Sequence, residues 1–371
     1  VLLIRSFDRL RSVDPGFSAQ GVLKVEYQLP AARYPRDFAV WPNWQEVHAF
    51  NAGVLARVRA LPGVSAAAIS EAHPLDPGFT NSFAIVGREA ESRDFPEITI
   101  RKVSPGYFET VQLPVLRGRA FNAGDASDSD LVLLINVTAA KRFFADREPI
   151  GQQIAFWGSA RTIVGVVGDE RLHGLADATP PAAYAPLTQV PSGLGTLLVR
   201  AAGDPMSHAA AVRAAVHEQD PALALFDVEP LAQTVSGSVA QQRFTMLLLA
   251  LFAALAMLMA AIGVYGLLSY VVSQRTAELG IRLALGAEPR SLMALIVAQA
   301  ARLALAGAAI GVLGALAASR LMRGLLFGIA ATDPRALAAG AVAIFAVALL
   351  ASLAPAKRAV GGDPLRALRV E

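Results

Sequence analysis

Hydrophobic and polar positions divide the chain into a mixed first part and an apolar last part. As far as about Gln241, short apolar runs are interrupted by polar residues, Gly and Pro, which is typical of a globular domain with strands and helices. No charged residue occurs between Arg243 and Arg275, a stretch longer than the roughly 20 residues that a membrane-spanning helix needs. Two further apolar segments follow. We therefore predict spanning helices over residues 244–271, 291–319 and 336–356.

The alternative for each of these segments is a buried helix of a large soluble protein. That interpretation suits a single segment, but too little chain remains to cover three of them with protein. The second segment is the weakest candidate because it carries Arg302. We expect an all-α transmembrane region of three helices within residues 241–371.

The first residues predict one more membrane element. Val1–Ile4 is apolar and runs directly into Arg5, Arg9 and Arg11. We expect residues 1–17 to contain the end of a spanning helix, whose beginning is missing, and its exit segment. The alternative for so short a run is an ordinary strand or helix end.

Residues 18–240 predict an α+β domain. Two stretches share one order of elements, a strand, a helix, a turn with Pro and a second strand, and could pack side by side in one sheet. Their elements cover residues 21–30, 43–60 and 64–70, and residues 196–202, 205–219 and 222–230. Between them, an inserted subdomain over about residues 75–190 is richer in short β runs and is predicted to be mainly β, with a helix around Val137–Ala145.

The positive-inside rule places this domain outside the cytoplasm. One side of the three helices carries seven basic residues, Arg275, Arg282, Arg290, Lys357, Arg358, Arg366 and Arg369. The other side carries four, Arg243, Arg320, Arg323 and Arg335. If Val1–Ile4 ends a span, Arg5, Arg9 and Arg11 join the outer side and the numbers become equal. These three residues border a long domain, where the rule has less weight. We therefore keep the prediction that the C-terminal tail is cytoplasmic.

Composition and motifs exclude most kinds of chemistry. Apolar residues make up 54% of the chain and charged residues 17%, which disfavours a disordered chain and a wholly soluble enzyme. A net charge of +3 does not indicate nucleic-acid binding, and the absence of Cys excludes thiolate catalysis and cysteine metal sites. The five histidines lack metal-binding spacing, and HExxH, GxSxG and GxxxxGK[ST] do not occur. We predict no catalytic, cofactor or metal site, and interpret Val166–Asp169 as a strand-ending turn.

The segment after the first span carries a pattern of alternating charged and apolar residues. Glu278 and Arg282 are four residues apart, a spacing that suits an ion pair on a short helix. Gly286 suits the end of that helix, and Pro289 its stop. Such a helix can present charges to a partner, or it can only anchor the spans at the membrane surface. The candidate surface consists of Arg275, Glu278, Ile281, Arg282, Leu285 and Gly286.

Two features of the second span are candidates for a role inside the membrane. Gly307 and Gly311 give one helix face small residues, which lets helices approach closely, although Gly is also simply common in spans. A charge as deep as Arg302 costs about 2.5–3.5 kcal/mol unless it finds a partner or reaches the headgroups. We predict that Arg302 faces a helix interface or the cytoplasmic headgroups.

The segment RTAELGIRLALGA (Arg275–Ala287) closely resembles the loop after the first span of the C-terminal domain in MacB/FtsX-like ABC transporter permeases. Further motifs resemble that family in the same order along the chain. They are Leu2–Phe17, Val103–Phe121, Pro149–Ile154, Thr162–Arg171, Leu325–Pro334, Ala354–Ala359 and Asp363–Glu371. The departures are Ala277 and Lys357, both at positions where the family frequently has Arg.

The resemblance implies a bacterial inner-membrane protein with several spans and its large domain in the periplasm. In this family, permease units pair through membrane helices, as two copies or as tandem repeats, and this chain would fit the second unit of a tandem permease. A separate cytoplasmic ATPase subunit docks on the loop, which here is Arg275–Ala287, and the tail after Lys357 is a second contact. A periplasmic adaptor is a further implied partner.

We therefore expect a non-catalytic permease subunit that couples ATP hydrolysis elsewhere to efflux or extraction of an amphiphilic substrate. The alternative is a membrane scaffold that transmits the same motion to a periplasmic cell-wall hydrolase. A membrane-bound enzyme is a third possibility, with almost no support from the residues.

Overall fold

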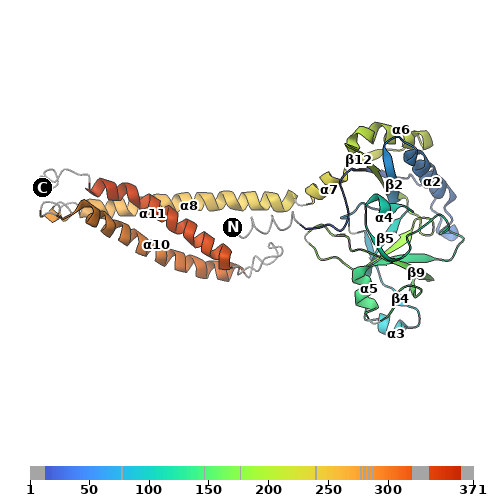
Figure 1. Cartoon of the computed structure of the whole chain (residues 1–371), viewed down its shortest axis with the longest axis horizontal. Coiled ribbons are helices and arrows are strands. Elements are labelled where there is room, and N and C mark those ends of the chain that lie inside the picture. The colour runs from blue at the N-terminus through green and yellow to red at the C-terminus, as the bar shows by residue number, and fades with distance from the viewer. Residues whose placement is uncertain are drawn as a thin grey trace. The chain divides into compact units, whose positions relative to one another are not determined.

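The computed structural model describes residues 13–76, 78–145, 147–175, 177–238, 240–275, 278, 281–282, 285, 287–319 and 334–360. The chain separates into two compact units, one over residues 13–240 and one that contains residues 241–371 (Figure 1). Val1–Ile4, which we expected to end a spanning helix, lies outside the described residues. The tail beyond residue 360, the expected second contact with the ATPase, also lies outside them.

The two strand–helix–strand stretches of the first unit lie in one sheet, as predicted, and their four strands pair antiparallel (Figure 1). The first is β1 (Val22–Gln28), α2 (Gln45–Arg59) and β2 (Val64–Ser70), and the second is β11 (Leu194–Ala201), α6 (Ala209–Gln219) and β12 (Leu225–Pro230). The strand order β12-β1-β11-β2 interleaves the two stretches, so each strand of one pairs with a strand of the other. This is the split βαβ arrangement.

Alternation along β1 determines which face of this sheet is covered. Leu23, Val25 and Tyr27 point into a core that also contains Phe50 of α2 and Val212 of α6. The helices therefore cover one face of the sheet, because their apolar stripes need the apolar face of the strands. Burial of this shared core stabilises the interleaved arrangement more than local propensity does.

The inserted subdomain continues the sheet beyond β2. Its elements are β3 (Phe79–Asn81), β4 (Ala84–Ile85), α3 (Glu89–Ser92), β5 (Ile98–Val103), α4 (Tyr107–Thr110), β6 (Val115–Gly118), β7 (Val132–Asn136), α5 (Val137–Phe143), β8 (Gln153–Phe156), β9 (Ser159–Val167) and β10 (Ala182–Pro186). The order is β2-β5-β10-β7-β9-β8-β4, with β3 on β5 and β6 on β9. Within the described strands, β2 and β5 pair only at Ser70 and Val103. The α+β prediction is confirmed.

A second core lies inside the inserted subdomain, so each part of the unit has its own. It brings together apolar residues of β5, β7 and β9 with Phe143 of α5 and Phe83. Three short helices complete the unit, η1 (Phe38–Val40), η2 (Pro205–His208) and α7 (Leu231–Gly237). The helix predicted over residues 205–219 therefore begins as a 3-10 turn before α6.

The second unit contains long apolar helices. They are α8 (Ala240–Gln274), α10 (Pro289–Ser319) and α11 (Pro334–Val360), of which α10 and α11 pack side by side (Figure 1). Within the described residues, Arg243–Gln274 and Ser291–Gly314 are long and apolar enough to cross a membrane, whereas α11 has a shorter apolar stretch, Ala338–Ala354. Two candidate spans are therefore present, and the third stays a prediction.

Candidate functional site

The predicted ion pair forms in the segment that follows α8. Glu278, Ile281 and Arg282 have helical backbone, and Arg282 Nη2 donates to Glu278 Oε1 at 2.6 Å. Both side chains are about half exposed, at 49% and 48%. Arg275, Glu278 and Arg282 also line a shallow crevice with Leu295 of α10. The charged residues of this segment are therefore gathered where α8 ends and α10 begins.

Two apolar side chains of the same segment face solvent. Ile281 is 49% exposed and Leu285 is 83% exposed. Exposed apolar groups beside a half-exposed ion pair are typical of a contact surface, but also of a helix that rests on the membrane. Gly286, the last residue of the predicted candidate surface, lies outside the described residues.

The small-residue face of α10 is open in this chain. Gly307 lies beside a groove of about 390 Å³ that is also lined by Gly263 of α8 and Ala348 of α11. A Cβ added to Gly307 or Gly311 would meet no atom within 4 Å among the described residues. These glycines therefore pack against no helix of the described chain, and their role in helix packing stays a prediction that needs a second unit.

Arg302 is an exposed residue of α10, one turn and a half before Gly307 in sequence. Its position on the helix surface is compatible with the prediction that it faces headgroups or an interface between units. That role stays a prediction.

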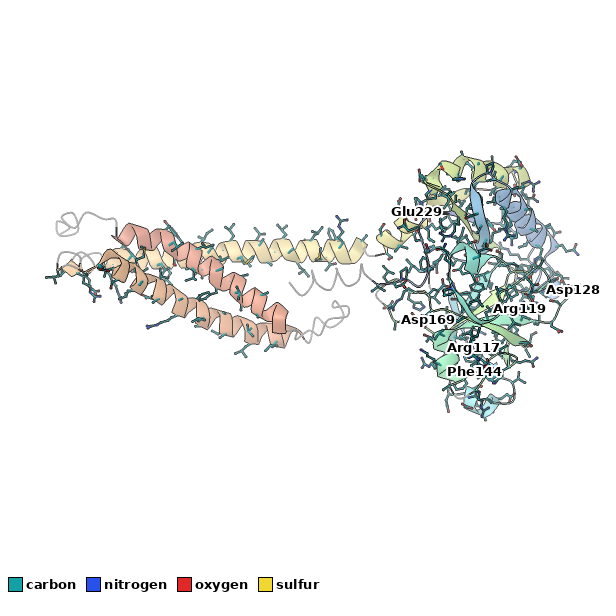
Figure 2. The ribbon with its side chains drawn as sticks, in the orientation of Figure 1. Arg117, Arg119, Asp128, Phe144, Asp169 and Glu229 are labelled. Carbon is teal, nitrogen blue, oxygen red and sulfur yellow. The ribbon has the colours of Figure 1, made fainter. Side chains whose placement is uncertain are left out.

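The end of β9 serves a structural purpose, in line with its interpretation as a strand-ending turn. Asp169 lies two residues after the end of β9 (Figure 2). It accepts two hydrogen bonds from Thr138, one from the backbone N–H and one from Oγ1, each at 2.9 Å. Asn136 caps the same helix, α5, by accepting from the N–H of Ala139. The first turn of α5 is thus satisfied by side chains of its own domain.

A buried polar cluster joins β5 to the segment after β9. Tyr184 and Tyr107 donate to Glu170 at 2.8 and 3.1 Å, and Arg101 Nε lies 3.9 Å from the same carboxylate. Burial raises the pKa of Glu170, although Arg101 and the two hydroxyls oppose this. Arg101 also donates to the backbone carbonyl of Asp76 at 2.7 Å. We interpret the cluster as a structural connection inside the domain.

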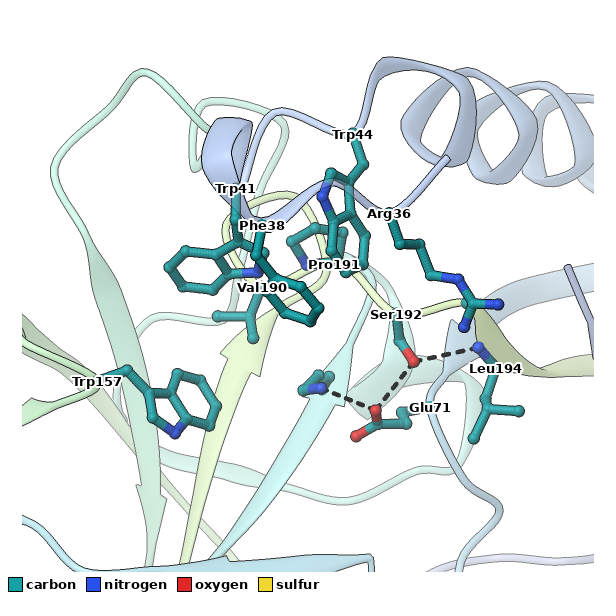
Figure 3. A pocket seen from close by; sticks show the side chains of 12 residues that line it. Arg36, Phe38, Trp41, Trp44, Glu71, Trp157, Val190, Pro191, Ser192 and Leu194 are labelled. Carbon is teal, nitrogen blue, oxygen red and sulfur yellow. Dashed lines mark hydrogen bonds and ion pairs between the residues drawn. The ribbon is translucent and has the colours of Figure 1, made fainter. Parts of the chain in front are cut away.

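One site of the first unit was not predicted from the sequence. All three tryptophans of the chain, Trp41, Trp44 and Trp157, line a single pocket where the inserted subdomain meets the segment between β1 and α2 (Figure 3). The residues come from segments more than 100 positions apart, so spacing along the chain carries no signal for the pocket. The one local signal is Trp157-Gly158, an unusual pair for a tight turn between two strands.

Two family models match the chain. The model described as MacB-like periplasmic core domain matches residues 17–219, and the model described as FtsX-like permease C-terminal matches residues 250–364. The first covers more than half of the chain.

Three curated relatives illustrate the similarity. The macrolide export ATP-binding/permease protein MacB of Marinobacter nauticus is 28% identical over 271 residues, which are 70% of this chain and 41% of the relative. The uncharacterized ABC transporter permease YknZ of Bacillus subtilis is 23% identical, over 74% of this chain and 70% of the relative. The pyoverdine export ATP-binding/permease protein PvdT of Pseudomonas syringae pv. tomato is 26% identical, over 70% of this chain and 40% of the relative. The chain thus spans less than half the length of the two export proteins.

Among solved structures, the periplasmic region of MacB from Actinobacillus actinomycetemcomitans matches 62% of this chain and 98% of its own length. The TM-score is 0.40 and the identity 13%. The extracellular domain of YknZ matches 56% of this chain and all of its own length, with a TM-score of 0.34 and 13% identity.

Proposed function

Because the chain belongs to the family of ABC transporter permeases that combine a MacB-like periplasmic core domain with an FtsX-like C-terminal domain, we propose that it couples the work of a separate ATPase subunit to its extramembrane unit. The observation that supports this proposal is the surface around the Glu278–Arg282 ion pair. It combines a fixed charge pair with the exposed apolar side chains of Ile281 and Leu285. Such a combination suits a protein partner, because charged groups fix the relative position of the two proteins and apolar side chains provide buried contact area.

The nucleotide has to be bound outside these residues. The sequence contains no GxxxxGK[ST] phosphate loop. MacB and PvdT are named ATP-binding/permease proteins, and this chain spans about two fifths of their length. We therefore propose that ATP hydrolysis takes place on a partner and reaches this chain through the segment after α8.

We further propose that the transported substrate is amphiphilic and leaves the cell or the membrane. Relatives named for macrolide export and pyoverdine export support this direction. These names favour export over the alternative of a membrane scaffold for a cell-wall hydrolase. A second permease unit would cover the open glycine face of α10, and a periplasmic adaptor would contact the extramembrane unit.

The chain is proposed to cross the bacterial inner membrane several times, with residues 13–240 in the periplasm. Two long apolar helices support a membrane location, and α11 would provide a third span. The excess of basic residues on the side of Arg275 and the tail supports a cytoplasmic position for the segment after α8.

The docking proposal is tested by reversing both charges of the ion pair. Glu278→Arg together with Arg282→Glu keeps an intramolecular pair but exchanges the charges that a partner meets. We expect the amount of ATPase that copurifies with the full-length protein to fall about tenfold or more, because like charges placed opposite each other at an interface cost several kcal/mol. The protein should still be found in the membrane fraction at its normal level.

The matched control reverses another exposed ion pair, Arg117→Glu with Glu148→Arg, in the extramembrane unit. This variant should copurify with the ATPase as the unmodified protein does. Unchanged copurification of the Glu278 and Arg282 variant would contradict the docking role of this segment.

A further inference from the structure

The pocket that contains the three tryptophans has the size and character of a small-molecule site. Its volume is about 650 Å³, within the range of roughly 300–1,000 Å³ that is usual for sites of drug-sized ligands. The wall is mainly aromatic and aliphatic, with few polar groups (Figure 3). It is formed by the segment between β1 and α2, the residues just before and at the start of β11, and Lys102 and Trp157 of the inserted subdomain. Both parts of the extramembrane unit therefore contribute to it.

Aromatic rings form one end of the pocket. Trp157 stacks on Phe79 with 5.6 Å between the ring centroids, and Trp41 meets Trp157 edge-on at 6.2 Å. Trp157 is 38% exposed and Phe38 is 79% exposed, so both rings have apolar surface that a ligand can cover. Trp44 differs from them, because it is buried and its Nε1 donates to the carbonyl of Asp37. We assign Trp44 to the wall and the other rings to ligand contact.

Trp157 is held in a backbone conformation that a bulky residue rarely adopts. It has φ +54° and is followed by Gly158 with φ +75°, in the two-residue turn between β8 and β9. Two-residue turns of this kind favour Asn-Gly, because Asn adopts a positive φ more readily than a bulky residue such as Trp. The turn therefore gains no stability from Trp at this position. Strain of this kind commonly accompanies a functional side chain.

Among the charged side chains that line the pocket, Lys102 pairs with Glu71, whereas Arg36 has no carboxylate partner among the described residues. Lys102 Nζ lies 2.8 Å from Glu71 Oε1, which also accepts a hydrogen bond from Ser192 Oγ at 2.9 Å, so this pair is neutral (Figure 3). Arg36 donates to the backbone carbonyl of Leu29 at 3.3 Å. Within the described part of the chain, it forms no ion pair. Its guanidinium lies against Gly193, near enough that a Cβ there would be 2.4 Å from Nη1.

We propose that this pocket binds an organic anion with a flat apolar body, whose rings contact Phe38, Trp41 and Trp157 and whose acid group pairs with Arg36. An anion is favoured because the unpaired guanidinium provides fixed donors that match a carboxylate. A flat body is favoured because indole and phenyl faces offer large apolar contact area. If the chain is part of an exporter, as proposed above, this anion is its substrate class, and that assignment rests on the proposed function. The binding itself does not, since it needs no ATP.

The test uses the full chain in lipid nanodiscs, with 5-fluorotryptophan in place of tryptophan. Three ¹⁹F resonances are expected, one for each tryptophan, and Trp→Phe variants assign them. The probes are 2-naphthoate, 2-naphthylmethanol and 2-naphthylmethylammonium, which share a ring system and differ in charge. We expect 2-naphthoate to shift the Trp157 and Trp41 resonances and to bind about tenfold more tightly than the alcohol, as a charge-assisted contact predicts. The ammonium compound should bind most weakly.

Two variants separate the contributions of charge and ring. Arg36→Gln should remove the preference for the anion, so that 2-naphthoate and the alcohol bind equally. The matched control is Arg57→Gln, which removes an exposed Arg of α2 that does not line the pocket and should leave the preference unchanged. Trp157→Asn suits the turn and should keep the fold, but it should weaken binding of both probes at least about fivefold, because the ring contact is lost.

The inference is wrong if the alcohol or the ammonium compound binds as tightly as 2-naphthoate, or if Arg36→Gln leaves the preference intact. It is also wrong if 2-naphthoate moves no tryptophan resonance beyond the change produced by its partition into the lipid. The assay contains no nucleotide and no ATPase. A failure here therefore leaves the docking proposal standing, and a loss of ATPase copurification leaves this binding unaffected.

Discussion

Asp220 connects the segment after β1 to the segment after α6. Tyr34 donates to Asp220 Oδ2 at 2.9 Å, Arg33 pairs with the same carboxylate, and the N–H of Ala222 donates to Oδ1 at 3.1 Å. Burial alone would raise the pKa of Asp220, but these hydrogen bonds outweigh it and place the pKa below the ordinary value. Because the folded state holds the ionised form more strongly, this contribution to stability is present above the unfolded pKa near 4 and is lost as the pH falls below it.

We expect Asp220→Asn to lower the free energy of unfolding of the extramembrane unit by about 1–2 kcal/mol at pH 7, because hydrogen bonds to a charged group are lost. The difference from the unmodified protein should shrink as the pH falls from about 4 towards the lowered pKa of the folded side chain, because protonation of Asp220 then favours the unfolded state of the unmodified protein. Thermal unfolding followed by near-UV circular dichroism at pH 7 and pH 3 measures both effects.

The control for this prediction is Asp128→Asn, at an exposed position (Figure 2). It should change stability little at either pH. An Asp220→Asn penalty of the same size at pH 3 and pH 7 would show that the ionised carboxylate is not the stabilising species.

At the level of elements, α8 and α10 are the candidate spans, and the orientation proposed for them places the charged segment after α8 in the cytoplasm. The sequence contains no Cys, so a single introduced Cys is the only site for a maleimide. Ala202 is an exposed residue after β11, and Leu285, in the segment after α8, is 83% exposed. We expect a membrane-impermeant maleimide to label Ala202→Cys in spheroplasts, and Leu285→Cys only after the membrane is permeabilised. Labelling of Leu285→Cys in intact spheroplasts would contradict the proposed orientation, because it would place this segment outside the cytoplasm.

The regular elements of the extramembrane unit could be predicted because their signals are local. The alternation in β1, the apolar stripe of α2 and the turn after Leu61 all lie within short windows of sequence. Side-by-side packing of the two strand–helix–strand stretches also followed from their common order. The interleaving of β1 and β11 did not, because local pattern contains no information about which strand pairs with which.

Strands β3, β6, β8 and β10 were not predicted individually. They have three to five residues each, and their conformation depends on the neighbouring strand more than on their own composition. The tryptophan pocket could not be predicted for a related reason. Trp41 and Trp157 meet because the inserted subdomain packs against the segment before α2, and such long-range packing leaves no periodic signal in the sequence.

The candidate surface after α8 was predictable in part. The four-residue spacing of Glu278 and Arg282 gave their ion pair correctly. The open surroundings of Gly307 and Gly311 were not foreseen, because a helix sequence does not distinguish a contact inside one chain from a contact between two chains.

For the molecule as a whole, the two units divide the proposed work between them. The unit after residue 241 offers a charged and apolar surface to a partner, and residues 13–240 form a domain with two cores and a pocket. This division of work requires that the state of a nucleotide bound elsewhere changes the extramembrane unit. Distance alone does not establish such coupling, which has to be measured as a difference between two nucleotide states.

Hydrogen–deuterium exchange of residues 13–240, in the full-length protein reconstituted with its ATPase, measures this coupling most directly. We predict that exchange differs between the ATP–vanadate and ADP states in the unmodified complex. The difference should disappear in the variant that combines Glu278→Arg with Arg282→Glu. Identical exchange in both nucleotide states, in a complex that hydrolyses ATP, would contradict the proposal that this chain transmits ATP-driven motion.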